Sequence, residues 1–273
     1  MLKQRVLTAI VLIIGFLAAL FLSPSWLWLA VVVLVSAVAA HEWSALSGFG
    51  QTGQWGFVLS TSVLCAGLGV ASGHVTASSW PGLLVLVYGL SALFWCGLAL
   101  PWMLGNWSLQ GKKPWRAVLT GWLVLLPPAL ALLHLRDVSP WLLLAAMALV
   151  WVADSAAFFV GRRFGRIKLA PAISPGKTRE GAYGALAGVL LYGLLVYWLS
   201  GFQGLALPVW LLCLPVLTVL SIVGDLFESL MKRQAGVKDS GKLLPGHGGV
   251  LDRIDSLTST LPLVGLLVLW GGV

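Results

Sequence analysis

Apolar runs with few charges recur along this chain at lengths that match the thickness of a lipid bilayer. A helix rising about 1.5 Å per residue needs about 20 residues to cross roughly 30 Å of hydrocarbon, where every backbone polar group must be satisfied internally. We predict nine spans, at about residues 5–22, 26–40, 56–72, 82–100, 117–135, 141–160, 182–199, 208–224 and 257–270. The second and the last are the shortest. The sequence therefore predicts an all-α, polytopic integral membrane protein.

The composition excludes an ordinary water-soluble fold. Of the 273 residues, 59% are hydrophobic and 10% are charged, whereas about a quarter of the residues in a soluble domain are charged. A soluble domain of this length could not hide so much apolar surface in its interior. We predict a single membrane domain over 1–273, with N-terminal transmembrane helices over 1–140, and with transmembrane helices and charged cytoplasmic loops over 141–273.

The basic residues are sorted to one side of the nine predicted spans. With the N-terminus inside, the inner segments hold Lys3 and Arg5, then the basic residues of 112–116, 162–179 and 232–253, and only Arg136 falls outside. Cytoplasmic loops carry such an excess of Lys and Arg. We therefore predict a multi-pass protein of the cell inner membrane, with a cytoplasmic N-terminus, the C-terminus opposite, and the charged loops facing the cytoplasm. The net charge of +8 does not indicate nucleic acid, because no soluble basic face is predicted.

Residues 224–255, GDLFESLMKRQAGVKDSGKLLPGHGGVLDRID, concentrate charge in an otherwise apolar chain. Asp225 and Glu228 have the i, i+3 spacing that places side chains on one helix face, and Asp252 and Asp255 repeat that spacing. Paired carboxylates suit Mg²⁺, which takes one or two carboxylates together with phosphate oxygens and water. A solvated loop with ordinary ion pairs is the alternative. Charge beside a membrane helix is costly unless it is used, which favours a functional site.

A glycine-rich turn separates these two pairs of carboxylates. Gly248 and Gly249 carry no side chain, so backbone N–H groups there can approach a phosphate closely. His247 and Arg253 add donors on either side of the turn. The turn is therefore a candidate phosphate-binding element.

A second polar stretch covers residues 154–181. Asp154 closes the sixth predicted span, where an ionisable residue is a functional candidate, although a buried hydrogen bond to a neighbouring helix would also explain it. Most basic residues of this stretch are explained by the positive-inside rule. Lys177, together with Ser174 and Glu180, is the candidate for substrate binding.

Gly176-Lys177-Thr178 imitates the end of a phosphate-binding P-loop. The first glycine of that motif would fall at Pro171, and no β-strand is predicted before it. We therefore reject a P-loop. Another polar group, His41-Glu42-Trp43 at the end of the second span, fits either structural hydrogen bonding or the rim of an active cavity.

The charged stretches resemble those of the phosphatidate cytidylyltransferases. The resemblance rests on Ser-x-x-Lys-Arg, Lys-Asp-x-Gly and Pro-x-His-Gly-Gly-x-x-Asp-Arg-x-Asp. Every element is present, as Ser229, Lys232, Arg233, Lys238, Asp239, Gly241, Pro245, His247, Gly248, Gly249, Asp252, Arg253 and Asp255. Residues 174–178 are similar to the family's Ser-Pro-x-Lys-Thr, although Arg179 stands where a Trp commonly follows, and Ser155-Ala156 stands where relatives often have Thr-Gly.

The resemblance implies transfer of the cytidylyl group of CTP to phosphatidic acid, giving CDP-diacylglycerol and pyrophosphate. It implies one or two Mg²⁺ ions held by Asp225 and Asp252 with Asp255 nearby, and a monovalent cation and a homodimer are further expectations. The predicted catalytic residues are Asp225, Asp252, Asp255, Lys232, Arg233 and His247. The predicted substrate-binding residues are Asp154, Ser174, Lys177, Thr178, Glu180, Ser229, Lys238, Asp239, Gly248, Gly249 and Arg253.

Three other functions are alternatives to this interpretation. A CTP-dependent polyprenol or lipid kinase would also bind CTP and a membrane lipid, but the full signature argues against it. A CDP-alcohol phosphotransferase would carry D-x-x-D-G-x-x-A-R, which is absent. A secondary transporter would place its charges near the membrane midplane, whereas here they collect in loops.

Overall fold

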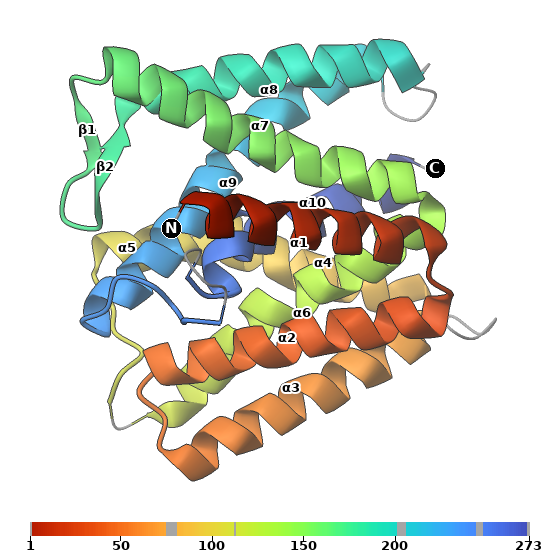
Figure 1. Ribbon diagram of the computed structural model, residues 1–273, viewed down its shortest axis with the longest axis vertical. Helices are drawn as coiled ribbons and strands as arrows, with labels where there is room; N and C mark the ends of the chain where they lie inside the picture. The colour runs from red at the N-terminus through yellow and green to blue at the C-terminus, as the bar shows by residue number, and fades with distance from the viewer. Residues whose placement is uncertain (1, 75–80, 112, 201–205, 244–247, 272–273) are drawn as a thin grey trace.

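The computed structural model describes residues 2–74, 81–111, 113–200, 206–243 and 248–271 (Figure 1). Most of the chain is helical. The elements in order are α1 (Leu2–Leu22), α2 (Ser25–Leu46), α3 (Gln51–Ala71), α4 (Pro81–Leu93), the π-helix η1 (Phe94–Leu98), α5 (Ala99–Leu104), α6 (Pro114–Val138), α7 (Pro140–Phe164), β1 (Lys168–Ala170), β2 (Ser174–Thr178), α8 (Arg179–Ser200), α9 (Leu207–Gln234) and α10 (Leu251–Gly271).

The helices confirm an all-α, multi-pass membrane fold. Among the described residues, eight helical segments are long and apolar enough to cross a bilayer, and one of them, Gly82–Leu104, runs through α4, η1 and α5. Helix α1 contributes a shorter apolar part at Ile13–Leu22. Each of the nine predicted spans therefore coincides with a helical segment.

Three helices extend well beyond their predicted bounds, and one of them, α10, begins at Leu251 rather than at about residue 257. Helix α2 continues to Leu46 and is not the short span that we predicted, because Glu42, Trp43 and Ser44 are buried among neighbouring helices rather than exposed at an interface. Helix α9 continues past Gly224 to Gln234, so one helix carries both a membrane span and the first half of the charged signature. Buried polar residues can extend a helix beyond its apolar run because protein, not lipid, surrounds them.

A short β-hairpin was not predicted. Strands β1 and β2 pair antiparallel, with Lys168 opposite Thr178 and Ala170 opposite Ser174. The prediction that no strand precedes Gly176-Lys177-Thr178 is wrong, but these three residues lie in β2 itself rather than in a loop that wraps a phosphate. The hairpin joins α7 to α8 and presents β2 beside the ends of both helices (Figure 1).

Helices α7 and α8 pack closely because glycines line their contact. A Cβ atom on Gly184 would overlap Val160, and one on Gly188 would lie 2.8 Å from the Cβ of Ala156. Such small-residue contacts allow helix backbones to approach closely in a membrane. The two predicted parts of the domain interlock, since α10 packs against α4 and α6 as well as α9.

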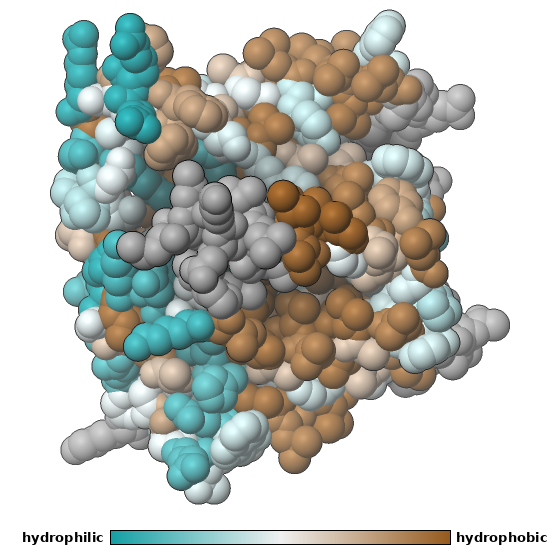
Figure 2. Space-filling model, viewed as in Figure 1, coloured by the Kyte–Doolittle hydropathy of each residue, from teal (hydrophilic) through white to brown (hydrophobic). Residues whose placement is uncertain are grey.

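Polar residues gather at one end of the helical bundle. Figure 2 shows hydrophilic side chains along the left edge, where the hairpin lies, and hydrophobic side chains across the middle. Helix α1 begins toward that polar edge and α10 ends at the opposite side (Figure 1). This arrangement agrees with an odd number of crossings. The assignment of the polar end to the cytoplasm stays a prediction.

Candidate active site

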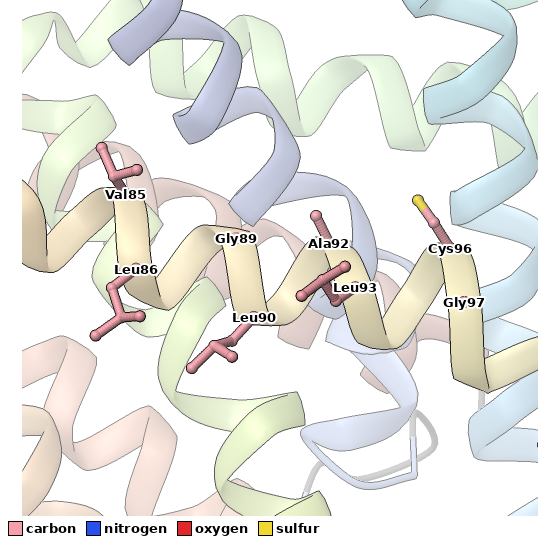
Figure 3. A pocket seen from close by; sticks show the side chains of 8 residues that line it. All are labelled: Val85, Leu86, Gly89, Leu90, Ala92, Leu93, Cys96 and Gly97. Carbon is pink, nitrogen blue, oxygen red and sulfur yellow. The ribbon is translucent and has the colours of Figure 1, made fainter.

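Two hollows of similar size differ in chemistry. One, of about 640 Å³, is lined by Val85, Leu86, Gly89, Leu90, Ala92, Leu93, Cys96 and Gly97 of α4 and η1 (Figure 3). None of these residues carries a charge, so this hollow offers nothing to bind the phosphates of a nucleotide. Its open, apolar surface on a single helical segment is what lipid chains would cover.

The other cavity, also about 640 Å³, opens at the polar end between α7, α8, β2, α9 and α10. Its charged lining residues are Asp154, Arg162, Lys177, Asp225, Asp252 and Asp255. Small residues form another part of the wall, among them Ala153, Ala157, Gly161, Gly181, Ala182 and Ala185. The cavity therefore joins a charged region to an apolar wall, as a site for a charged nucleotide and a lipid requires.

Lys177 and Asp225 form an ion pair across the cavity. Strand β2 supplies Lys177 and helix α9 supplies Asp225, and Lys177 Nζ lies 2.6 Å from Asp225 Oδ2. Ser229, one turn further along α9, donates a hydrogen bond of 3.2 Å to Asp225 Oδ1. Both carboxylate oxygens of Asp225 thus have a donor, and a lysine from the predicted substrate-binding segment is aimed at a predicted metal ligand.

Asp252, in the first turn of α10, has the most contacts of the predicted catalytic residues. Lys232 Nζ lies 2.6 Å from Asp252 Oδ1. Asp252 Oδ2 accepts hydrogen bonds from the backbone N–H groups of Gly249, at 2.8 Å, and Ser240, at 2.9 Å. Gly248 has a φ of +83°, a conformation that glycine adopts readily, and a side chain there would press on Asp252. The glycine-rich turn therefore orients a carboxylate in this structure.

Asp154, Asp225 and Asp255 bring negative charge together on three different helices around the cavity. Like charges this close repel one another unless cations lie nearby, and Lys177 balances only part of that charge. The donors are carboxylate oxygens, which suit a hard cation such as Mg²⁺. Among the described residues, no three His, Cys, Asp or Glu side chains converge to hold a metal alone. The residues therefore fit an ion that is completed by substrate phosphates and water.

Thr178 and Glu180 shape the cavity through hydrogen bonds to backbone. Thr178 is buried, and its Oγ1 accepts the Gly181 N–H at 3.1 Å, at the start of α8. Glu180 accepts the N–H groups of Arg166, at 3.0 Å, and Ile167, at 3.2 Å, which fastens the hairpin to α8. Thr178 lines the cavity and Glu180 does not.

The structure gathers only part of the predicted site at the cavity. Its lining includes Asp154, Ser174, Lys177, Thr178, Asp225, Asp252 and Asp255. The remaining described candidates do not line it, namely Glu180, Ser229, Lys232, Arg233, Lys238, Asp239, Gly248, Gly249 and Arg253. Of these, Ser229, Lys232 and Gly249 donate hydrogen bonds to carboxylates that line the cavity. His247 lies outside the described residues.

Some predicted substrate-binding residues are exposed in the loop between α9 and α10 or beside it. Lys238, Asp239 and Arg253 are exposed. Arg233 is also exposed, and its Nε donates to the backbone carbonyl of Ile173 at 3.3 Å, which ties α9 to the hairpin. Their predicted contacts with substrate stay predictions.

The predicted catalytic and substrate-binding residues omit three that the structure places at or beside the site. Arg162 lines the cavity, and we had explained it by the positive-inside rule alone. Glu228 is buried, with Oε1 3.4 Å from Lys232 Nζ, and its i, i+3 spacing from Asp225 was the available signal. Ser240 lies at the variable position of Lys-Asp-x-Gly, so the motif gave no signal for it.

Glu42 does not line this cavity. Its carboxylate accepts hydrogen bonds from the segment that precedes α10 and from the start of that helix. Of the two alternatives for His41-Glu42-Trp43, the structure favours hydrogen bonding for Glu42.

Comparisons with known proteins match nearly the whole chain. The model of the cytidylyltransferase family matches residues 3–270. A phosphatidate cytidylyltransferase of Pseudomonas aeruginosa is 42% identical over 272 residues, covering 99% of this chain and 97% of the relative. One of Haemophilus influenzae is 38% identical, with 96% of each chain covered. One of Brucella suis is 46% identical over 149 residues, or 53% of each chain. The chain therefore belongs to the cytidylyltransferase family.

Proposed function

We propose that this protein transfers the cytidylyl group of CTP to phosphatidic acid, releasing pyrophosphate and forming CDP-diacylglycerol for phospholipid synthesis. One observation carries the proposal. A single cavity combines Lys177 and the carboxylates of Asp225, Asp252 and Asp255 with an apolar wall inside a membrane bundle. Relatives that match 96% or more of the chain are named phosphatidate cytidylyltransferases.

The reaction needs no nucleophile from the protein. A phosphate oxygen of phosphatidic acid forms a new bond to the α-phosphorus of CTP, and the bond between that phosphorus and the α–β bridging oxygen breaks. Pyrophosphate leaves with the electron pair. Because a phosphate monoester is already anionic near neutral pH, the protein has mainly to align the two substrates and offset their repulsion.

Lys177 and Lys232 supply positive charge at two places in the site. Lys177 lies 2.6 Å from Asp225, and Lys232 lies 2.6 Å from Asp252 and 3.4 Å from Glu228. Lysine ammonium groups held in this way can turn toward phosphate oxygens while keeping a carboxylate contact, because each has three donors. Positive groups placed beforehand stabilise charge that develops on a leaving pyrophosphate.

Asp225 and Asp252, with Asp255 nearby, would hold one or two Mg²⁺ ions together with the substrates. Bound Mg²⁺ would offset charge on the triphosphate and on the departing pyrophosphate. A requirement for a monovalent cation stays a prediction.

The wall of small residues from α7 and α8 provides a place for the lipid substrate. Ala157 and Gly161 of α7 face Gly181 and Ala185 of α8 around the cavity. Acyl chains that remain in the bilayer can pass beside such a wall, while CTP reaches the charged end from water. The proposal places that charged end at the cytoplasmic face of the inner membrane, in agreement with the sorting of Lys and Arg. A homodimer stays a prediction.

The test is an assay with two labels. The purified protein is incubated in liposomes with phosphatidic acid, Mg²⁺ and CTP labelled either in cytosine or at the γ-phosphate, and Asp252→Asn is run in parallel. We expect cytosine label to enter the lipid, γ-label to leave as pyrophosphate, and both events to be lost in the variant.

Two outcomes would overturn the proposal. Entry of γ-label into lipid would identify a CTP-dependent kinase. If neither label enters lipid and the folded protein does not bind CTP, the enzyme assignment fails and transport must be tested.

A further inference from the structure

Glu42, on α2 in the first half of the chain, contacts three residues of the second half that belong to the charged stretch 224–255. Its side chain is buried, with 4% of the residue exposed. It accepts three hydrogen bonds, from Ser240 Oγ at 2.9 Å, from Val250 N at 3.0 Å and from Leu251 N at 2.8 Å. The nearest of these partners in sequence is 198 residues away from Glu42.

These contacts cap helix α10 from another helix. The first N–H groups of a helix have no acceptor within it, and a preceding Ser, Thr, Asp or Asn commonly supplies one. Here Gly248, Gly249 and Val250 precede α10, and none has an acceptor in its side chain. Glu42 supplies the acceptor for Val250 and Leu251, and its negative charge suits the positive end of the helix dipole.

The Glu42 carboxylate is stabilised by hydrogen bonds and by the N-terminal end of α10. Within the described part of the chain, Glu42 forms no ion pair with Lys, Arg or His. A buried carboxylate is costly unless its oxygens are well supplied with donors. The donors of Ser240, Val250 and Leu251 meet that need, so these residues and Glu42 stabilise one another.

Two glycines of the charged stretch 224–255 leave room for the Glu42 carboxylate. Cβ atoms on Gly241 or Gly249 would overlap the Glu42 carboxylate. Glycine at both positions therefore permits the close approach of α2 to the segment. Gly241 and Gly249 belong to the signature, whereas Glu42 lies outside it, so the signature alone does not reveal the partner.

Ser240 connects Glu42 to Asp252. Ser240 Oγ lies 2.9 Å from Glu42 Oε2 and 3.0 Å from Asp252 Oδ2, and its single proton can be donated to one of them at a time. The Ser240 N–H also donates to Asp252. A shift of Glu42 would move Ser240, and with it part of the support of Asp252.

We propose that Glu42 is a positioning residue of the active site, which holds Ser240 and the start of α10 against α2 so that Asp252 keeps its orientation toward Lys232 and the cavity. Glu42 does not line the cavity and acts through Ser240 and the start of α10. This inference rests on the proposed function for its effect on catalysis, but the structural coupling can be tested without the reaction.

The first measurement is amide hydrogen exchange in the purified full-length protein in detergent, without substrates. Glu42→Gln keeps the size and one acceptor oxygen, whereas Glu42→Ala removes both acceptors. We expect exchange over residues 249–252 to rise about tenfold or more in Glu42→Gln and further in Glu42→Ala, as helix-end hydrogen bonds are lost. Ser36→Ala, which removes a buried hydroxyl from the same helix, should leave exchange in this segment unchanged.

The second measurement is steady-state kinetics per folded molecule. Loss of support for a metal-site ligand typically costs about 10- to 100-fold. We expect kcat to fall by that factor in Glu42→Gln, with KM for phosphatidic acid within about twofold of wild type, while Ser36→Ala retains wild-type values. In a double-mutant cycle, Glu42→Gln combined with Ser240→Ala should lose less activity than the product of the two single losses.

The outcomes separate this inference from the proposed function. Unchanged exchange at 249–252 in Glu42→Ala would overturn it, whatever the enzyme does. A rise in exchange throughout the protein, with kcat per folded molecule unchanged, would show a merely structural role and would also overturn it. If wild-type protein makes no CDP-lipid, the proposed function fails, while the exchange result still decides whether Glu42 orders the start of α10.

Discussion

The two ends of the bundle contain similar residue types with different partners. At the cavity end, Lys177 and Lys232 contact the side chains of Asp225 and Asp252. At the other end, Arg136 donates to backbone carbonyl groups, from Nε to Leu20 at 2.9 Å and from Nη2 to Ser23. The lysine contacts join side chains that line or adjoin a cavity, whereas the Arg136 contacts join a side chain to the backbone at the end of α1.

His74 and Asp137 complete the group at the far end. His74 Nδ1 lies 2.6 Å from Asp137 Oδ2, and its Nε2 lies 3.0 Å from the backbone oxygen of Ser25. The guanidinium of Arg136 lies 5.3 Å from the ring centroid of Trp28. These contacts join the end of α6 to the connections that follow α1 and α3, so they fasten helices together.

The comparison teaches that the partner, not the residue type, separates a binding site from a structural contact. A lysine paired with a carboxylate beside a cavity can exchange or share that partner with a phosphate. An arginine that satisfies carbonyl groups at a helix end leaves those groups unpaired if it moves, and buried unpaired groups are costly. Four predictions test this distinction, from the largest expected effect to the smallest.

The largest effect is expected from Asp252→Asn. It removes the negative charge opposite Lys232 and a predicted metal ligand, so we expect cytidylyl transfer to fall about 1,000-fold, or about 4 kcal/mol in the transition state. The measurement is kcat/KM for CTP in liposomes. The matched control is Asp137→Asn, the same substitution at an ion pair of the far end, which should retain activity; equal losses in both variants would break the comparison.

Lys177→Met should have the next largest effect. It removes the ammonium that contacts Asp225 while keeping an unbranched side chain of similar length, so we expect kcat/KM for CTP to fall about 100-fold. Lys168→Met, on the neighbouring strand of the same hairpin, does not alter the cavity lining and serves as control. A similar loss in the control would mean that general positive charge, not Lys177, binds the substrates.

Arg136→Ala should change stability rather than catalysis. It leaves carbonyl groups at the end of α1 without their donor, and we expect the free energy of unfolding to fall by about 2 kcal/mol. Thermal unfolding in detergent measures the loss, and activity is compared per folded molecule. A tenfold loss of kcat in folded protein would contradict the structural assignment of this end.

The smallest effect is expected from Asp137→Asn. The Asp137 side chain is 39% exposed, so solvent weakens its contact with His74, and we expect a destabilisation of at most about 1 kcal/mol. The same thermal measurement applies, with Ser72→Ala as a nearby control that lacks this contact. A loss larger than that of Arg136→Ala would reverse the order of importance proposed for these two residues.

Much of the fold followed from local patterns. Apolar runs of bilayer length predicted the spans, but the last predicted span began at about residue 257, whereas α10 begins at Leu251 and holds Asp252 and Asp255 in its first turns. The ends of α2 and α9 were missed, because contacts with other helices, not the apolar run, decide where they stop. The hairpin was missed because its strands have three and five residues and little periodicity.

The sequence by itself determined the membrane class, the positions of the helices and the family, because hydrophobic length and motif spacing are local properties of the chain. Only the tertiary structure decided that Lys177 pairs with Asp225, that Lys238 and Asp239 stay outside the cavity, and that Glu42 caps α10. Such pairings join residues far apart in the chain. They depend on how helices pack and which donors are left without partners, and no local pattern encodes that information.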